Sequence, residues 1–184
     1  MMKHSKPELV ILDRDGLINE DSDDYIKSSN EWRAIPGSIE AIIKLKENNI
    51  KVAIATNQSG IARGFFSCAE LDKIHQKLYD SLATNADAIQ HIACCPHVPD
   101  DFCECRKPKI GLLQEISQLL NIKLSLEVYF IGDSIKDIKA ARVAGCTPVL
   151  VKTGKGLRTL ANYRSEIDGI MVFNNLQQFV EWLI

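Results

Sequence analysis

Two acidic residues follow the first apolar segment of the chain, in the order Asp13-Arg14-Asp15-Gly16 after residues 9–12. One carboxylate of such a pair can attack an electrophile or bind a cation, while the other transfers a proton. Gly16 allows the chain to turn sharply at this point. A single pattern of this kind is also typical of a polar turn, so its meaning depends on what lies near it in space.

A second acidic pair, Asp133 and Asp137, follows the apolar segment 128–131. Alone, either residue would be explained as a helix cap, because acidic side chains favour the positive end of the helix dipole. If these residues converge with Asp13 and Asp15, their mutual repulsion requires a cation. A site built only from oxygen ligands suits Mg²⁺.

Two further segments offer groups that can hold a phosphoryl group. Thr56-Asn57-Gln58-Ser59-Gly60 follows the apolar segment 51–55, and its hydroxyl, amide and backbone N–H groups suit that role. Lys107 would add a fixed positive charge. Alone, the first segment is an ordinary turn and the lysine a surface group. The segment Thr153-Gly154-Lys155-Gly156 lacks the spacing of a P-loop, so we do not expect ATP binding there.

Four potential zinc ligands lie close together in a loop over about residues 94–108: Cys95, His97, Cys103 and Cys105. Three thiolates and one imidazole suit a tetrahedral structural zinc site. The spacings C-x-H and C-x-C are tighter than the common C-x₂-C, and the alternatives are incidental cysteines or a redox pair. We expect zinc to brace the part of the loop that carries Arg106 and Lys107, and we expect Cys68 and Cys146 to pack in the core.

Short apolar runs alternate with segments of helical periodicity along the whole chain. The predicted strands are residues 9–12, 51–55, 88–94, 128–131, 148–151 and 170–173. The predicted helices are residues 36–48, 68–82, 110–120, 135–144, 157–164 and 176–184. This alternation indicates an α/β three-layer sandwich around a mostly parallel sheet. Sites in such folds form beyond the carboxyl ends of the strands, which is where the acidic pairs lie.

Length and composition limit the classes of protein to consider. The chain has 184 residues, of which 46% are hydrophobic and 25% charged, and its formal net charge is -2. These values fit one globular domain over residues 1–184, and they indicate neither a nucleic-acid nor a membrane partner. The start of the sequence lacks the features of a secretory signal, and no apolar run approaches the roughly 18 residues that span a bilayer. We therefore expect a cytoplasmic monomer with reduced cysteines.

The ordered segments D-R-D-G, T-N-Q, a lysine before a helix, and G-D-x-x-x-D resemble the four motifs of haloacid dehalogenase phosphatases. The resemblance implies a Rossmann-like fold, without a large cap domain because no long insertion separates the motifs. It also implies that Asp13 is the nucleophile and that Asp15 acts as general acid and then general base. Thr56 and Lys107 would hold the phosphoryl group. Asp13, the backbone carbonyl of Asp15, and Asp133 would bind Mg²⁺.

Within this superfamily, the cysteine loop resembles two groups of phosphatases that act on small phosphorylated molecules. One group hydrolyses D-glycero-D-manno-heptose 1,7-bisphosphate at the 7-phosphate in lipopolysaccharide precursor synthesis, and the other hydrolyses histidinol phosphate. The segments 56–66 and 149–156 are similar to the first group. The resemblance implies that the sugar phosphate is bound by Asn19, Glu20, Asp21, Tyr25, Thr56, Asn57, Gln58, Ser59, Arg106 and Lys107. Arg106 would take the distal phosphate, because a guanidinium matches its geometry.

Two classes without turnover stay open on the sequence alone. A receiver-like module also has a phosphorylated aspartate at a strand end, but it lacks a second acid two residues later, which Asp15 supplies. A zinc-stabilised binding domain would explain the cysteine loop and leave the four ordered motifs without a role. The sequence therefore favours an enzyme.

Overall fold

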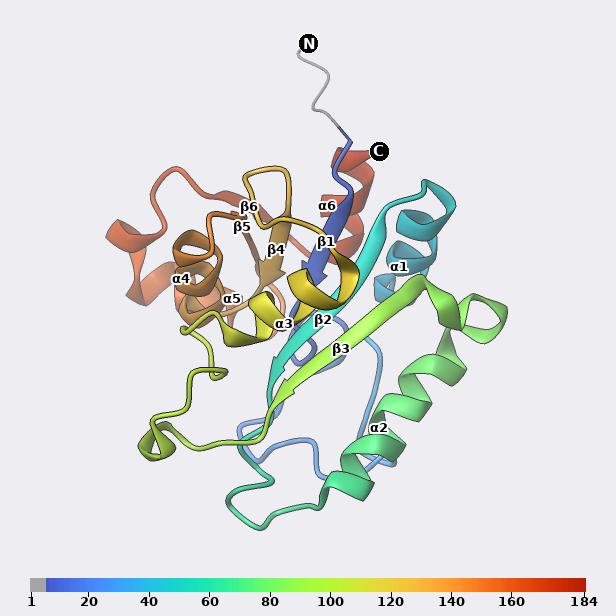
Figure 1. The fold of residues 1–184 in the computed structure, drawn as a ribbon, viewed down its shortest axis with the longest axis vertical. Coiled ribbons are helices and arrows are strands. Elements are labelled where there is room, and N and C mark those ends of the chain that lie inside the picture. Colours follow the sequence, from blue (N-terminus) through green and yellow to red (C-terminus); the bar gives the residue numbers. More distant parts are fainter. Residues whose placement is uncertain (1–5) are drawn as a thin grey trace.

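A six-stranded parallel sheet forms the centre of the computed structural model, which describes residues 6–184. Its strands are β1 (Leu9–Leu12), β2 (Lys51–Asn57), β3 (Ile89–Cys95), β4 (Tyr129–Gly132), β5 (Thr147–Val151) and β6 (Met171–Phe173). Their order across the sheet is β3-β2-β1-β4-β5-β6, and each neighbouring pair is parallel (Figure 1). The predicted mostly parallel sheet is confirmed, and every pairing within it is parallel.

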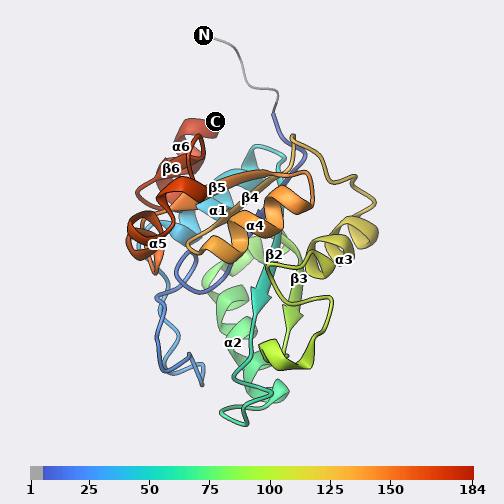
Figure 2. The same cartoon turned by 90° about the vertical axis from the view of Figure 1, so that its left-hand side faces the viewer.

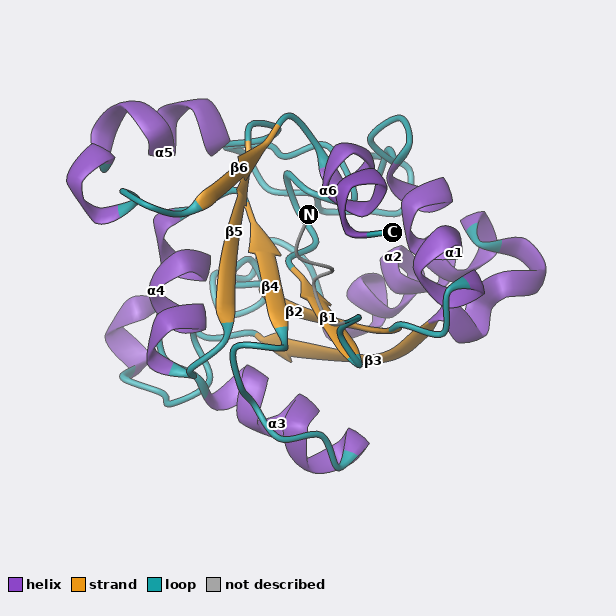
Figure 3. Ribbon diagram, turned by 90° about the horizontal axis from the view of Figure 1, so that it is seen from above, coloured by secondary structure: helices purple, strands orange, loops and turns teal. Residues whose placement is uncertain are grey.

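Six helices cover the two faces of this sheet. They are α1 (Ser38–Glu47), α2 (Cys68–Ser81), α3 (Gly111–Leu120), α4 (Ile135–Val143), α5 (Gly156–Asn162) and α6 (Leu176–Leu183). Helices α1, α2 and α6 lie on one face and α3, α4 and α5 on the other (Figures 2 and 3). The predicted three-layer sandwich is therefore confirmed.

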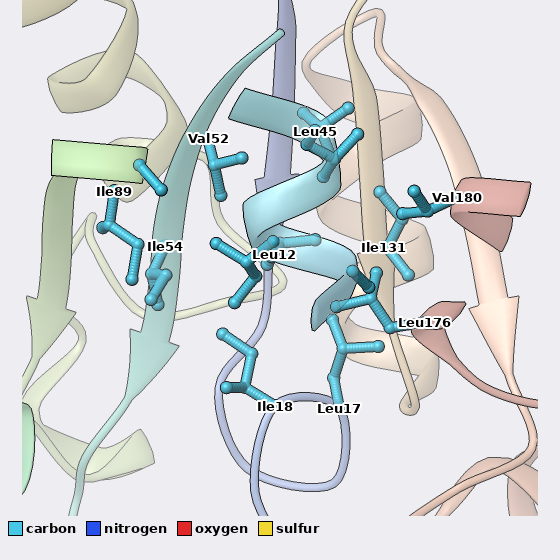
Figure 4. Close-up of a cluster of buried hydrophobic side chains, with 14 of the residues drawn as sticks. Leu12, Leu17, Ile18, Leu45, Val52, Ile54, Ile89, Ile131, Leu176 and Val180 are labelled. Carbon is cyan, nitrogen blue, oxygen red and sulfur yellow. The ribbon is translucent and has the colours of Figure 1, made fainter. Parts of the chain in front are cut away.

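The larger hydrophobic core lies between the sheet and helices α1, α2 and α6 (Figure 4). Alternate residues of one strand, such as Val52 and Ile54, point into this core. Leu45 of α1 and Val180 of α6 belong to the same core and reach it from the helical layer, Val180 near Ile131. Strand residues of both faces are buried because each face of a parallel sheet carries helices, which explains the continuous apolar runs in the sequence.

The opposite face of the sheet carries small side chains on β2 and β3. Ala53, Ala55 and Ala93 lie there beside Leu112 and Ile116 of α3. Small strand residues allow a helix to approach the sheet closely. This close contact holds the start of α3, and the cysteine loop that precedes it, against the carboxyl ends of β2 and β3.

Predicted and observed element ends agree to within about two residues, which is the usual uncertainty of helix and strand boundaries. Three short 3₁₀ helices were not predicted, at Ala83–Ala88, Pro99–Asp101 and Arg164–Glu166. A single helical turn is too short to show an apolar period. Cys146 is buried as predicted, but the prediction for Cys68 is wrong, because this residue lies exposed in the first turn of α2.

Among residues 6–184, the connections on the site side of the sheet contain no separate cap domain. The predicted lack of a secretory signal concerns the start of the chain, and residues 1–5 lie outside the described residues. Within the described part, none of the helices combines the length and the apolar character needed to cross a membrane.

We predict that Leu45→Ala destabilises the fold through the loss of core packing. Leu45 is fully buried between α1 and the sheet, so its truncation should lower the free energy of unfolding by about 2–5 kcal/mol. Lys44→Ala on the exposed face of the same helix should change it by less than about 0.5 kcal/mol. Urea unfolding of the two variants measures the difference, and equal losses would contradict the packing described above.

Candidate active site

The acidic pairs meet at the point where the strand order of the sheet reverses. The chain proceeds from β1 to β2 and β3 on one side, then crosses to β4 on the other side of β1. Asp13 follows β1 and Asp133 follows β4, and the backbone N–H of Asp13 donates to the carbonyl of Ile131 at 2.9 Å. Ligands of doubly wound sheets bind at this switch point, beyond the carboxyl ends of the strands. A cleft of about 530 Å³ opens there, and both aspartates line it.

Lys107 lies at the bottom of this cleft as a buried cation, with 2% of its side chain exposed. Its Nζ is 2.9 Å from Oδ1 of Asp13 and 2.6 Å from Oδ1 of Asp137, and it donates to the carbonyl of Ala55 at 2.8 Å. Burial by itself would lower the pKa of Lys107, but the two carboxylates raise it above its ordinary value. The ammonium group therefore stays protonated beside the predicted nucleophile.

Asn57, at the end of β2, holds the backbone that carries this lysine. Its side-chain Nδ2 donates to the Lys107 carbonyl at 3.1 Å, and its Oδ1 accepts from the Lys107 N–H at 3.1 Å. Two hydrogen bonds between one side-chain amide and the N–H and C=O of one residue fix both the position and the direction of that backbone. Asn57 is thus tied to Lys107, in addition to its place on the cleft wall.

Asp15 is held by four side-chain hydrogen bonds. Nε and Nη2 of Arg14 reach its two oxygens at 3.0 and 3.1 Å, Asn19 Nδ2 reaches Oδ1 at 2.9 Å, and Gln58 Nε2 reaches Oδ2 at 2.8 Å. Burial alone would raise the pKa of Asp15, but the Arg14 guanidinium and these hydrogen bonds lower it overall. Asp15 is therefore ionised in the ligand-free protein.

Three other carboxylates form a cluster that suits a cation, since Asp13, Asp133 and Asp137 each offer an oxygen within 4.8 Å of the others. Burial and then the Asp137 charge raise the pKa of Asp133 to about 7, and the same causes raise that of Asp13 well above its usual range. An oxygen-coordinated Mg²⁺ would remove this repulsion. Asp137 also caps α4, because the Ser134 N–H and hydroxyl donate to its Oδ2 at 3.0 and 2.6 Å.

The segment Thr153–Gly156 supports the predicted metal ligand Asp133 from behind. The Lys155 N–H donates to Asp133 Oδ2 at 2.7 Å, and the Thr153 hydroxyl donates to the Gly16 carbonyl at 2.6 Å. A Cβ on Gly16 would lie 2.1 Å from Asp133 Oδ2, so only glycine fits at this left-handed turn. The segment 153–156, which lacks the spacing of a P-loop, thus holds the Asp133 carboxylate at the end of β4.

The four predicted zinc ligands come together at the end of β3 and in the loop that follows. Their Sγ and Nδ1 atoms are separated by 3.2 to 3.7 Å in the pairs Cys95–His97, Cys95–Cys103, Cys95–Cys105, Cys103–Cys105 and His97–Cys105. Ligand atoms at about 2.3 Å from a tetrahedral zinc would lie roughly 3.8 Å apart. The donor set and its compact shape therefore fit structural zinc, with Nδ1 as the imidazole ligand.

The same loop positions Arg106 at the edge of the cleft. Nη1 of Arg106 donates to the backbone carbonyl of His97 at 2.9 Å. At the start of α3, the Gly111 N–H donates to the carbonyl of Glu104 at 3.1 Å, and a Cβ on Gly111 would lie 2.7 Å from that carbonyl oxygen. Contacts this close leave the cysteine loop one position, so a metal bound there would also hold Arg106.

Eight of the ten residues predicted to bind the sugar phosphate line the cleft: Asp21, Tyr25, Thr56, Asn57, Gln58, Ser59, Arg106 and Lys107. The structure does not bring Asn19 and Glu20 into the same cleft. Asn19 is fully buried and donates to Asp15 and to the Glu20 carbonyl, because its loop folds back beneath Asp15. Glu20 faces a neighbouring hollow beside Pro36.

Three basic residues of the cleft were not predicted, namely Lys136, Lys155 and Arg158. Nζ of Lys155 lies 2.8 Å from Asp21 Oδ2. The pKa of Lys136 is lowered, first by burial and then by the charge of Arg106. Five basic and five acidic residues line the cleft, and its basic side chains suit an anionic ligand when a bound cation offsets the acidic ones. Lys136 stands in the first turn after Asp133, where its position in the motif could have suggested a role, but no local pattern identifies Arg158.

Arg14 and His75 were also not predicted as parts of the site. Arg14 is fully buried behind Asp15, and His75 of α2 lies 3.2 Å from its Nη1. An arginine between two aspartates is only a weak indication of a role in the site, since the sequence does not tell which way its side chain points. For His75 there is no signal, because it stands 61 residues away within an ordinary amphipathic helix.

Comparison with known proteins finds the same family across most of the chain. A profile described as haloacid dehalogenase-like hydrolase matches residues 2–145. D-glycero-beta-D-manno-heptose-1,7-bisphosphate 7-phosphatase of Pseudomonas aeruginosa is 52% identical over 168 residues, covering 91% of this chain and 93% of that protein. The protein of the same name from Pseudomonas putida is 48% identical over 177 residues, covering 96% and 99%.

Among solved structures, a similar one is D,D-heptose 1,7-bisphosphate phosphatase from B. bronchiseptica complexed with magnesium and phosphate. Its TM-score is 0.90 with 45% sequence identity, covering 96% of this chain and 97% of that chain. A second, from Burkholderia thailandensis, has a TM-score of 0.69 and 34% identity. The likeness therefore covers the fold as a whole.

We predict that the purified protein contains about one zinc per chain and that Cys105→Ser loses it. A hydroxyl is a poor ligand for zinc, so the variant should retain less than about half a zinc and show a lower Tm. Cys68→Ser is the matched control, because Cys68 is exposed and lies outside the cluster. Elemental analysis measures the metal, and zinc-free wild-type protein of normal stability would count against the site.

We predict that Mg²⁺ stabilises the protein more at about pH 8 than at about pH 5.5. Because Asp133 has a raised pKa, the folded chain keeps its proton after the unfolded chain has lost it. The contribution of Asp133 to the free energy of unfolding of the metal-free protein therefore falls as the pH rises from about 4 to 7. Mg²⁺ binds the ionised carboxylates, so its binding restores the free energy of unfolding that is lost at high pH.

Thermal unfolding with EDTA and with Mg²⁺ at the two pH values measures this effect. Asp133→Asn should reduce the difference between them, since it removes a raised carboxyl pKa and a metal ligand together. A Tm increase from Mg²⁺ that is the same at both pH values in the wild type would refute the prediction.

Proposed function

This chain belongs to the haloacid dehalogenase-like hydrolases, and on that premise we propose that it removes the 7-phosphate of D-glycero-β-D-manno-heptose 1,7-bisphosphate. It is thus a phosphoric monoester hydrolase of lipopolysaccharide heptose synthesis. The β anomer follows from the names of its relatives. The proposal also takes residues 1–184 as one domain that acts as a monomer in the cytoplasm, where thiols remain reduced for zinc.

The observation that carries this proposal is the position of Lys107 beside Asp13. A buried ammonium group 2.9 Å from a carboxylate oxygen supports attack on a phosphate, because it neutralises the charge of both partners. Thr56, which is buried at the end of β2, adds a hydroxyl on the cleft wall beside them. Phosphoryl transfer depends mainly on such in-line positioning and charge neutralisation.

In the first step, an oxygen of Asp13 attacks phosphorus and forms an aspartyl-phosphate. The bond between phosphorus and the sugar oxygen breaks, and Asp15 gives its proton to that oxygen. Asp15 is ionised in the ligand-free protein, but a phosphate dianion beside it raises its pKa. Binding of the substrate therefore supports the protonation that this step needs.

In the second step, Asp15 takes a proton from a water molecule, whose oxygen attacks the phosphorus of the aspartyl-phosphate. The bond to Asp13 breaks, and inorganic phosphate leaves. The lowered pKa of Asp15 keeps this carboxylate ionised, so it is free to accept that proton. Mg²⁺, held by Asp13, Asp133 and the backbone carbonyl of Asp15, would neutralise negative charge on the phosphoryl oxygens throughout.

The basic rim of the cleft supports a substrate with two phosphates. Arg106 uses one donor for the His97 carbonyl, and its guanidinium has further N–H groups for an anion. Lys136 and Lys155 line the same cleft. A second phosphate near them would relieve the repulsion among these cations. We propose that this rim selects the bisphosphate over sugars with a single phosphate.

The experiment that tests the proposal is phosphate release with Mg²⁺ from both heptose bisphosphate anomers, histidinol phosphate and an aryl phosphate. We expect the β anomer to have the highest kcat/KM, and Asp13→Asn to lower kcat by at least about a thousandfold because no nucleophile remains. A preference for histidinol phosphate would keep the mechanism and refute the substrate. Full activity of Asp13→Asn would refute the mechanism itself.

A further inference from the structure

Arg14 is a buried cation that the reaction described above does not use. Its side chain is fully buried, and it lies behind Asp15 rather than on the cleft wall. Burying a guanidinium is costly unless its donors are paired, so a position like this one needs specific partners. Nε and Nη2 are paired with the two oxygens of Asp15, and Nη1 lies 3.2 Å from Nε2 of His75.

His75 completes this arrangement from a separate element. It is on α2, which otherwise turns Leu71, Ile74 and Leu78 into the core. A guanidinium has donors only, so Nε2 of His75 must accept and the ring hydrogen must lie on Nδ1. Burial and the Arg14 charge lower the pKa of His75 to about 4, which keeps the ring neutral and able to accept.

We propose that His75 is a positioning residue that fixes, through Arg14, the direction in which Asp15 transfers its proton. The planar guanidinium sets the plane of the Asp15 carboxylate through two hydrogen bonds. Its third nitrogen must be held as well, or the side chain can pivot and turn that plane. Asn19 and Gln58 bind the same carboxylate from other sides, so His75 adjusts the angle rather than supplying the only restraint.

This inference rests on the proposed role of Asp15 as general acid and base, and it makes a prediction about leaving groups. A sugar alkoxide is a poor leaving group and needs the proton of Asp15, whereas an aryl oxide leaves without one. A badly oriented Asp15 should therefore slow cleavage of a sugar phosphate far more than cleavage of an aryl phosphate. A residue that only supports the fold would affect both substrates alike.

The test compares His75→Leu with the wild type on these two substrates. We expect kcat/KM for the sugar phosphate to fall by about tenfold or more, and kcat/KM for the aryl phosphate by less than about threefold. His75→Gln keeps an acceptor for Arg14 and should recover most of the loss. His91→Leu is the matched control, since His91 of β3 pairs with Glu115 of α3 and does not line the cleft.

A second measurement uses the aryl phosphate alone. Water attack on the aspartyl-phosphate still needs Asp15 as base, so acid-quenched His75→Leu should contain more phosphorylated Asp13 than the wild type during turnover.

The sugar phosphate in the first comparison is whichever one the wild type cleaves fastest. A different natural substrate would thus overturn the proposed function without affecting this test.

Equal losses on both substrates, with no build-up of phosphoenzyme, would overturn the proposal and leave His75 a structural role only. Unchanged kinetics in His75→Leu would overturn it too. If His75→Leu is too unstable to assay, His75→Gln and His75→Asn still decide the matter, because side chains with different reach to Arg14 should give different ratios between the two substrates.

Discussion

The buried ion pairs of Lys107 are the constraint on which the rest of the site depends. Asp13, Asp133 and Asp137 converge where β1 and β4 end, and carboxylates that close repel one another in a place that water hardly reaches. One ammonium group bridges Asp13 and Asp137 and cannot offset all three charges. The remaining repulsion favours the binding of a cation at this edge of the sheet. It also shifts the carboxyl pKa values, as is typical of sites where charge moves during a reaction.

Much of the surrounding structure holds these groups against that repulsion. Asn57 and the cysteine loop fix the backbone of Lys107, while the segment Thr153–Gly156 fixes Asp133. Arg14, Asn19 and Gln58 hold Asp15. These supports come from the segments after β1, β2, β3 and β5, so the site is assembled only when those strands have paired in the sheet. Metal in the cysteine loop would add rigidity where the chain has no regular structure.

The two acid residues of the first motif acquire opposite properties from these surroundings. Asp13 lies among other carboxylates, and its pKa is raised by burial and by Asp137. Asp15 lies two residues later among donors, and its pKa is lowered overall. Environments that separate the pKa values of neighbouring carboxyl groups assign them different tasks. The proposed nucleophile and the proposed proton carrier are thus distinguished by what packs around them.

The sequence by itself determined the elements, their order and the chemistry at their ends. Parallel strands buried on both faces leave continuous apolar runs, and the acids of Asp13 and Asp133 stop those runs where the sheet ends. The cysteine loop was recognisable because its ligands are close in sequence. Only the tertiary structure decided that Asn19 turns inward, that Lys155 reaches Asp21, and that His75 meets Arg14. The last two contacts join segments far apart in the chain, and the first depends on how a short loop folds back. Whether such side chains meet depends on how the loops and helices pack, which no local pattern records.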